Sequence, residues 1–316
     1  VVGLGVQHAG DRLAGVQHLL HQPKPRPGLL GPEAGPHWQE FASKVVRGES
    51  AALALEALRS RGFVPDVVFV HPGWGEALHV KDVFPDARLL VYGEYFYGQP
   101  GGDAGFDPEF GADSLTLRQR TRLKNTHLLH ALAVADGVLS PTHFQASQHP
   151  AWVQDRITVV HDGIDTARFA PDPAASVHLK VARSTLRPGD EILTFVAREL
   201  EPYRGYHTFV RSLPLLQQLR PQARVVIVGG DGVSYGAAAP RGATWKQHFL
   251  SEVADRIDMD RVHFVGKLPH EVLTQLMQVS AAHVYLTYPF VLSWSLLEAM
   301  SVGCVVVGSD TAPVRE

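Results

Sequence analysis

The chain has 316 residues, a length that corresponds to roughly two domains. Hydrophobic residues make up 45% and charged residues 19%, which excludes an intrinsically disordered protein, a collagen-like repeat and a charge-driven tail. The net charge of -3 argues against nucleic-acid binding over a basic surface, and the single cysteine, Cys304, excludes an intramolecular disulfide and a cysteine-rich metal site. Apolar runs are too short to predict a transmembrane helix.

Short runs rich in Val and Ile alternate along the chain with longer amphipathic stretches. Strands are predicted at residues 1–6, 67–70, 89–92, 137–139, 157–160, 192–196, 225–228, 262–265, 283–286 and 305–307. Helices are predicted at residues 42–61, 115–135, 207–218, 245–256, 269–278 and 295–302. Several strands are apolar on both faces, as in parallel sheets covered by helices, so the sequence predicts an α/β fold.

A domain boundary is predicted within residues 165–190. This stretch contains Pro171, Pro173 and Pro188 and follows the turn-forming sequence of residues 161–163, His-Asp-Gly. The predicted domains are therefore residues 1–170 and 171–316, each a Rossmann-like parallel sheet. Ligands of such sheets bind at the carboxyl ends of the strands, so the expected site is a cleft that the two domains face.

Two arginines follow the predicted strand at residues 192–196. Arg198 lies at its carboxyl end, and Arg204 with Gly205 immediately precedes a predicted helix. Two guanidinium groups beside a helix N-terminus form a favourable site for a diphosphate. The alternative interpretation is a pair of surface arginines in a solvated loop.

Glu298 is predicted in the first turn of the helix that begins at Ser295. A carboxylate at this position would face the same cleft and accept hydrogen bonds from a ribose diol. The alternative is a first-turn glutamate that the helix dipole favours without any ligand.

Taken together, these segments resemble the retaining glycosyltransferases of family 4, which have the two-domain GT-B fold. The resemblance covers most of the chain and includes a match of residues 162–165 (DGID) to the inter-domain motif usually written NGID. In the second half it rests on the arginine segment followed, in order, by residues 228–232 (VGGDG), 264–267 (FVGK), 295–303 (SLLEAMSVG) and 305–309 (VVVGS).

The resemblance implies that Arg198 and Arg204 bind the diphosphate of a nucleotide-sugar donor, with Arg204 in place of the family's usual lysine. It implies that Glu298 holds the ribose and that Gly266 belongs to the turn lining the nucleobase. The other donor-binding residues it implies are Gly205, Ser293, Trp294 and Ser295. With His71, the residues Arg198, Arg204 and Glu298 form the predicted catalytic set.

One position departs from the family pattern. Family members place a first glutamate eight residues before the second, and Phe290 stands there in this chain. The missing carboxylate puts recognition of the donor sugar in doubt. Phe290 could instead stack on a sugar ring.

Residues 65–76 predict a strand that ends in a glycine-rich loop at the same cleft. The resemblance implies that His71 lies near the acceptor and the transferred sugar, where it would orient or polarise groups without being an obligatory base. The predicted acceptor-binding residues are His71, Gly73, Trp74 and Glu76. Alternatively, His71 is a turn histidine bonded to the backbone, and Trp74 covers the core. Glu94 and the aromatic residues 95–97 either shape the acceptor pocket or belong to the core.

Three weaker signals are interpreted without a ligand. The sequence Asp258-Met259-Asp260 resembles a metal-binding DxD motif but precedes a strand, so it is predicted to be a turn. The basic run at residues 118–124 fits a solvated helix face, or a contact with lipid phosphates or an anionic acceptor. His127 and His130 share a helix face, but no third ligand joins them at metal-binding spacing.

The sequence therefore predicts a hexosyltransferase, of the kind used in polysaccharide biosynthesis, that transfers a sugar from a nucleoside diphosphate sugar to a saccharide or lipid-linked acceptor with retention. No metal or other cofactor, and no nucleic-acid partner, is expected. A cytoplasmic location is expected, with contact to the inner face of the membrane left open. The alternatives are a sugar-nucleotide epimerase or phosphorylase, a non-catalytic nucleotide-sugar-binding module, or an inactive fragment. Because the chain begins and ends on predicted core strands, a fragment lacking both family termini is expected.

Overall fold

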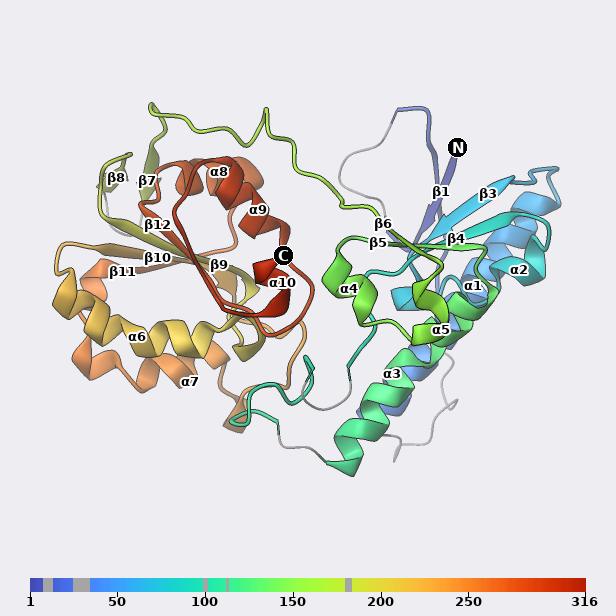
Figure 1. The fold of residues 1–316 in the computed structure, drawn as a ribbon, viewed down its shortest axis with the longest axis horizontal. Helices are drawn as coiled ribbons and strands as arrows, with labels where there is room; N and C mark the ends of the chain where they lie inside the picture. Colours follow the sequence, from blue (N-terminus) through green and yellow to red (C-terminus); the bar gives the residue numbers. More distant parts are fainter. Residues whose placement is uncertain (8–13, 25–34, 99–101, 112–113, 180–183) are drawn as a thin grey trace. The chain divides into compact units, whose positions relative to one another are not determined.

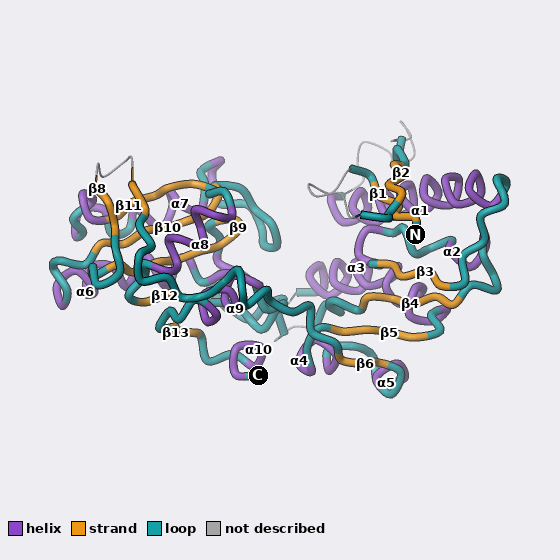
Figure 2. The backbone as a smooth tube through the Cα atoms, turned by 90° about the horizontal axis from the view of Figure 1, so that it is seen from above, coloured by secondary structure: helices purple, strands orange, loops and turns teal. Residues whose placement is uncertain are grey.

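The computed structural model describes residues 1–316 except 8–13, 25–34, 99–101, 112–113 and 180–183. The chain divides into two compact units. Unit 1 comprises Val1–His161 together with Glu316, and unit 2 comprises Asp162–Arg315. Figures 1 and 2 show the helices and strands of each unit.

Unit 1 contains a sheet of four parallel strands in the order β3-β4-β5-β6. These strands are Val67–Val70, Arg88–Tyr92, Gly137–Ser140 and Ile157–Val159. Two further strands, β1 (Val2–Gly5) and β2 (Gln17–Leu20), pair with each other in parallel. The predicted parallel arrangement is confirmed, and it directs the carboxyl end of β3 into the loop that carries His71.

Two long helices, α1 (Pro36–Arg59) and α3 (Leu115–Val134), pack on each other in unit 1, as Figure 1 shows. Apolar side chains from α3 and the strands form one buried cluster, which includes Leu89, Val91, Leu132 and Val138. Burial of these side chains is the main favourable contribution to the stability of the unit. The shorter helices are α2 (Val80–Val83), α4 (His143–Ser147) and α5 (Ala151–Gln154).

Unit 2 contains five parallel strands in the order β11-β10-β9-β12-β13. The strands are β9 (Ile192–Glu199), β10 (Arg224–Gly230), β11 (Val262–Gly266), β12 (Ala282–Tyr285) and β13 (Val306–Gly308). Val225, Val226 and Ile227 of β10 are fully buried, as expected for a central strand covered on both faces.

Helices cover both faces of the unit 2 sheet (Figure 1). α6 (Tyr206–Leu219) and α7 (Trp245–Ser251) lie on one face, and α8 (His270–Gln278) and α9 (Trp294–Ser301) lie on the other. The last helix is α10 (Ala312–Arg315). The 3-10 turns are Pro72–Trp74, Pro202–Arg204, Pro240–Gly242, Ala254–Arg256 and Met259–Arg261.

Local structure differs from the sequence predictions in two places. Residues 165–190, where no strand was predicted, contain β7 (Val177–Leu179) and β8 (Ser184–Leu186), which pair in antiparallel orientation. Their side chains Val177, Leu179 and Leu186 alternate inward into the core of unit 2. The helix predicted at residues 245–256 ends at Ser251, because the chain then forms a separate 3-10 turn.

In the part of the chain that the structure describes, no helix is both long enough and apolar enough to cross a bilayer.

Candidate functional site

The strand order of unit 2 defines where a ligand would bind. From β9 the chain moves outward through β10 to β11 and then crosses back, so that β12 lies on the other side of β9. At such a point the loops after β9 and β12 leave in opposite directions, and ligands bind in the crevice at their carboxyl ends. Most of the predicted donor-binding residues lie on these two loops and the helices after them.

Arg198 occupies the carboxyl end of β9 and has an exposed side chain. The preceding residue, Ala197, is buried, because successive residues of a strand point to opposite faces. The guanidinium of Arg198 is therefore accessible at the edge of the sheet where the sequence predicted a diphosphate.

The turn between β9 and α6 requires glycine at position 205. Gly205 has a φ of +67°, and a Cβ there would lie 2.3 Å from the Cβ of Leu286, just after β12. The fully buried Glu201 accepts hydrogen bonds from the backbone N–H groups of residues 234–236 at 3.1–3.3 Å. Burial raises the pKa of this carboxyl, and the N–H groups oppose that rise. The close contact at Gly205 and the hydrogen bonds of Glu201 thus both restrain the turn between β9 and α6.

Arg204 is only 8% exposed. Its Nη1 donates toward the hydroxyl groups of Tyr285 and Thr287 and toward the carbonyl of Val291, at 3.2, 3.0 and 3.1 Å. All three acceptors are uncharged, so these hydrogen bonds hold the guanidinium without neutralising it. A buried, hydrogen-bonded cation of this kind is suited to binding an anion.

Phe290 is 3% exposed and lies among aromatic side chains. Its ring centroid is 5.5 Å from that of Tyr203 and 4.9 Å from that of Tyr235. Because the ring is already packed in the interior of unit 2, this position does not offer a face for a sugar. The suggestion that Phe290 stacks on a sugar ring is therefore not supported.

Polar groups at the start of α9 form hydrogen bonds with side chains of the protein. The backbone N–H of Ser293, predicted to bind phosphate, donates to the Tyr285 hydroxyl at 2.8 Å. The hydroxyl oxygens of Ser293 and Ser295 are 2.8 Å apart. The indole N–H of Trp294 donates to Asp162 at 2.9 Å, and the Trp294 side chain is largely exposed. The DGID segment and the first residue of α9 are thus joined by a hydrogen bond.

Glu298 lies one turn inside α9, not in its first turn, because the helix begins at Trp294. Its Oε1 is 3.0 Å from Nε2 of His270, the first residue of α8, and the side chain is 10% exposed. Phe169 packs against the imidazole, with ring centroids 5.2 Å apart. The sequence reasoning missed His270, although its place soon after β11 resembles the place of Glu298 after β12.

The backbone at Gly266, in the turn at the end of β11, has open space beside it. Gly266 has a φ of +68°, and a Cβ there would meet no atom within 4 Å. The next residue, Lys267, donates to Glu199 at 2.5 Å, and Glu199 also accepts the Gly232 N–H at 2.8 Å. These bonds tie together the carboxyl ends of β9, β10 and β11 beside the turn that the sequence assigned to the nucleobase.

In unit 1, His71 lies at the carboxyl end of β3 and forms two polar contacts. Its Nδ1 accepts the backbone N–H of Gly73 at 3.0 Å, which leaves the proton on Nε2 in the neutral ring. Nε2 lies 3.1 Å from Oε2 of Glu94, on the loop after β4. The histidine is therefore both bonded to its own turn and oriented by a carboxylate.

The neighbouring acceptor residues differ in how accessible they are. Trp74 is 51% exposed and stacks on His71, with ring centroids 4.4 Å apart. Gly73 accepts a hydrogen bond from His127 at 3.1 Å through its carbonyl. Glu76 is paired with Arg47 of α1, with an Nε–Oε1 distance of 2.9 Å. In the structure, the predicted Glu76 carboxylate thus has a partner within unit 1.

The basic residues at positions 118–124 of α3 lie in two different environments. Its three arginines, at positions 118, 120 and 122, have exposed side chains, in agreement with a solvated face. The ammonium of Lys124 instead lies 3.6 Å from the ring centroid of Tyr97, and burial lowers the pKa of this lysine.

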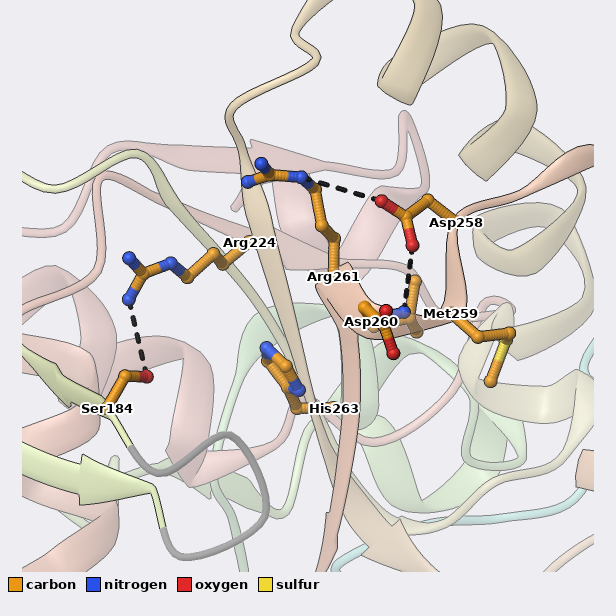
Figure 3. A pocket seen from close by; sticks show the side chains of 8 residues that line it. Ser184, Arg224, Asp258, Met259, Asp260, Arg261 and His263 are labelled. Atoms are coloured by element: carbon orange, nitrogen blue, oxygen red, sulfur yellow. Dashed lines mark hydrogen bonds and ion pairs between the residues drawn. The ribbon is translucent and has the colours of Figure 1, made fainter.

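A pocket of about 620 Å³ lies at the amino-terminal edge of the unit 2 sheet (Figure 3). It contains the Asp258-Met259-Asp260 segment, where the Asp258 carboxylate accepts the Asp260 N–H at 2.9 Å and lies 3.7 Å from Arg261. This arrangement is the predicted turn. Across the described residues, no three His, Cys, Asp or Glu side chains are grouped as metal ligands.

Comparisons with known proteins agree with these observations. The chain is similar to a D-inositol 3-phosphate glycosyltransferase of Streptomyces coelicolor, with 26% identity over 56% of the chain and 41% of that protein. It is also similar to a GDP-mannose-dependent alpha-(1-6)-phosphatidylinositol monomannoside mannosyltransferase of Mycobacterium tuberculosis, with 40% identity over 22% of the chain and 17% of that protein. The chain thus spans well under half the length of these curated relatives.

Solved structures show the same fold. Sucrose-phosphate synthase from Thermosynechococcus elongatus has a TM-score of 0.64 at 17% identity, over 96% of the chain and 68% of that structure. The catalytic domain of starch synthase IV from Arabidopsis thaliana has a TM-score of 0.57 at 16% identity, over 87% and 62%.

Family models extend over both units of the chain. The model of the glycosyl transferase family 4 group matches residues 1–169, and that of the glycosyl transferases group 1 matches residues 179–316. With the parallel sheets of both units, these matches confirm the predicted α/β architecture. The chain belongs to the glycosyl transferase family 4 group, and its fold is the GT-B fold.

Proposed function

We propose that the protein transfers a sugar from a nucleoside diphosphate sugar to a saccharide or lipid-linked acceptor, with retention of anomeric configuration. Unit 2 binds the donor and unit 1 binds the acceptor. The names of the relatives above, which refer to inositol 3-phosphate and to a phosphatidylinositol mannoside, support a hydroxyl-rich acceptor that carries a phosphate or a lipid. The reaction takes place in the cytoplasm, with a lipid-linked acceptor presented at the membrane surface.

The observation that carries this proposal is the buried, hydrogen-bonded guanidinium of Arg204 beside the point where the strand order reverses. In the proposal, Arg204 and the exposed Arg198 bind the two phosphates of the donor. Glu298 accepts hydrogen bonds from the ribose, and the open backbone at Gly266 lies against the base. Arginines also stabilise the charge that develops on the leaving diphosphate.

On the acceptor side, the proposal assigns His71 an orienting role. Glu94 holds the Nε2 proton of His71 in place, and Trp74 offers an exposed ring face for a sugar. The bond between the anomeric carbon and the diphosphate oxygen breaks while the acceptor oxygen bonds to the same face of that carbon. The acceptor proton passes to the departing phosphate oxygen, so no enzymic nucleophile is needed.

The proposal is tested by titrating nucleoside diphosphates into the full-length protein by calorimetry and then measuring nucleotide release from sugar donors with an acceptor present. We expect Arg198→Ala to weaken diphosphate binding at least tenfold, because a charge-assisted contact is lost. We expect His71→Asn to lower turnover while leaving that affinity unchanged. Absence of diphosphate binding by the folded wild-type protein would refute the proposal.

A non-catalytic nucleotide-sugar-binding protein is the second candidate, and the absence of a carboxylate at Phe290 favours it. The same experiment separates the two functions. The non-catalytic function would be supported if the protein binds a nucleoside diphosphate tightly but turns over no nucleotide sugar. The acceptors in that assay should be a panel of saccharides and lipid-linked compounds. Anomeric analysis of a product by NMR then tests retention.

A further inference from the structure

Two aromatic rings lie against the guanidinium of Arg204. The Cζ atom is 5.3 Å from the ring centroid of Tyr235 and 5.7 Å from that of Phe290. The two rings meet edge to face, with their centroids 4.9 Å apart. Phe290 is 3% exposed and Arg204 is 8% exposed, so this contact is largely shielded from water.

The hydrogen bonds described above for Arg204 are all made by one guanidinium nitrogen, Nη1. Nη1 points at three neutral oxygens, from Tyr285, Thr287 and Val291. Nearby, the carboxylate of Glu201 accepts the N–H groups of residues 234–236. The hydrogen bonds that hold Arg204 thus go to neutral groups, while the nearby Glu201 carboxylate attracts its charge without a direct hydrogen bond among the described contacts.

Aromatic rings have a property that a carboxylate lacks at this position. The negative face of a ring attracts a cation without forming a salt bridge, and the attraction is stronger when water is excluded. A carboxylate beside the same buried guanidinium would pair with it, occupy its donors and cancel the charge that an incoming diphosphate needs.

We propose that Phe290 is a positioning residue which, together with Tyr235, holds Arg204 charged and oriented for the donor diphosphate. This inference rests on the proposed role of Arg204 in donor binding. It gives the departure at position 290 a function, because in this chain the aromatic ring contacts the guanidinium where the family usually has a carboxylate. A glutamate here would remove that contact and pair with Arg204, so we expect it to impair this protein.

The test is calorimetric titration of the full-length protein with a nucleoside diphosphate and, separately, with the same nucleoside without phosphate. Phe290→Leu keeps an apolar side chain and removes the ring, so we expect diphosphate binding to weaken about 3- to 30-fold and nucleoside binding to stay unchanged. Phe290→Glu is expected to weaken diphosphate binding further than Phe290→Leu. Phe209→Leu is the matched control, because Phe209 is equally buried in unit 2 and stacks on Phe195.

A double-mutant cycle shows whether Phe290 acts through Arg204. In an Arg204→Gln background the guanidinium is absent, so Phe290→Leu should have almost no further effect on diphosphate binding. An equal effect in both backgrounds, an equal loss of nucleoside binding, or wild-type affinity in Phe290→Glu would overturn the inference. If Phe290→Glu does not fold, the comparison of Phe290→Leu in the two backgrounds decides the question.

The outcomes also separate this inference from the proposed function. Diphosphate binding that is lost in Arg204→Gln but indifferent to Phe290→Leu would leave the donor site in place and reject the role of Phe290. Diphosphate binding that is unaffected by Arg204→Gln would reject the donor site itself, and the role of Phe290 with it.

Discussion

The hydrogen bond between His270 and Glu298 determines where the proposed ribose contact lies. Glu298 is almost buried, and its Oε1 meets the imidazole at 3.0 Å. A carboxylate that accepts one hydrogen bond keeps free lone pairs for a diol, and its direction is then fixed. His270 in turn packs on Phe169, so both ends of the pair are restrained.

We expect His270→Ala to weaken nucleoside diphosphate binding about tenfold, because Glu298 then loses the hydrogen bond that orients it. Calorimetry should show a smaller loss for a 2′,3′-dideoxy nucleotide, which lacks the hydroxyl groups that Glu298 would bind. Glu271→Ala is the control, since Glu271 is the next residue on α8 and is exposed. An equal loss for both nucleotides would contradict the role of His270.

At the level of elements, the turn from β9 to α6 depends on a single glycine. Gly205 combines a left-handed backbone with close contact to Leu286 of the neighbouring loop. The turn thereby brings Arg204 against the last residue of β12 and the segment after it, where its three hydrogen-bond acceptors lie. Neither the strand nor the helix alone would place the guanidinium there.

Gly205→Ala should lower the free energy of unfolding by about 2–4 kcal/mol, from backbone strain together with a collision against Leu286. Gly189→Ala isolates the first effect, because Gly189 has a φ of +96° but open space around a Cβ. Its expected loss is about 1 kcal/mol. Urea unfolding measures both values, and equal losses would show that the contact with Leu286 does not matter.

Across the whole molecule, burial keeps several histidines neutral. Burial is the first cause that lowers the pKa of histidines in both units, namely His21, His127, His149, His263 and His283. The largest effect is at His283, a fully buried residue of β12 whose pKa is lowered to about 4. Its Nδ1 lies 2.9 Å from the hydroxyl of Thr194 on β9.

These shifts predict how stability depends on pH. The unfolded chain protonates His283 near pH 6.5 and the folded chain only near pH 4, so stability is lost as pH falls through this window. The contribution of His283 to this loss is about 3 kcal/mol. In His283→Asn, urea unfolding at pH 7.5 and pH 4.5 should show a smaller loss by about that amount. An unchanged difference between the two pH values would refute the prediction.

Local patterns were sufficient for much of the architecture. Runs such as residues 67–70 and 225–228 are apolar on both faces, and this property belongs to the segment itself, whatever it packs against. The short antiparallel strands β7 and β8 were missed because prolines and a glycine surround them, while their inward side chains are recognisable only from the core they enter. Similarly, nothing local distinguishes Glu76 as a partner of Arg47.

The order of apolar runs, glycines and arginines along the chain was thus enough to indicate parallel α/β units, and it predicted a site at the carboxyl ends of their strands. Tertiary structure alone decided that Glu298 meets His270, that Glu94 orients His71, and that Phe290 lies against Arg204. The physical reason is distance along the chain. Secondary structure follows from residues a few positions apart, whereas the environment of a side chain depends on segments that folding brings together.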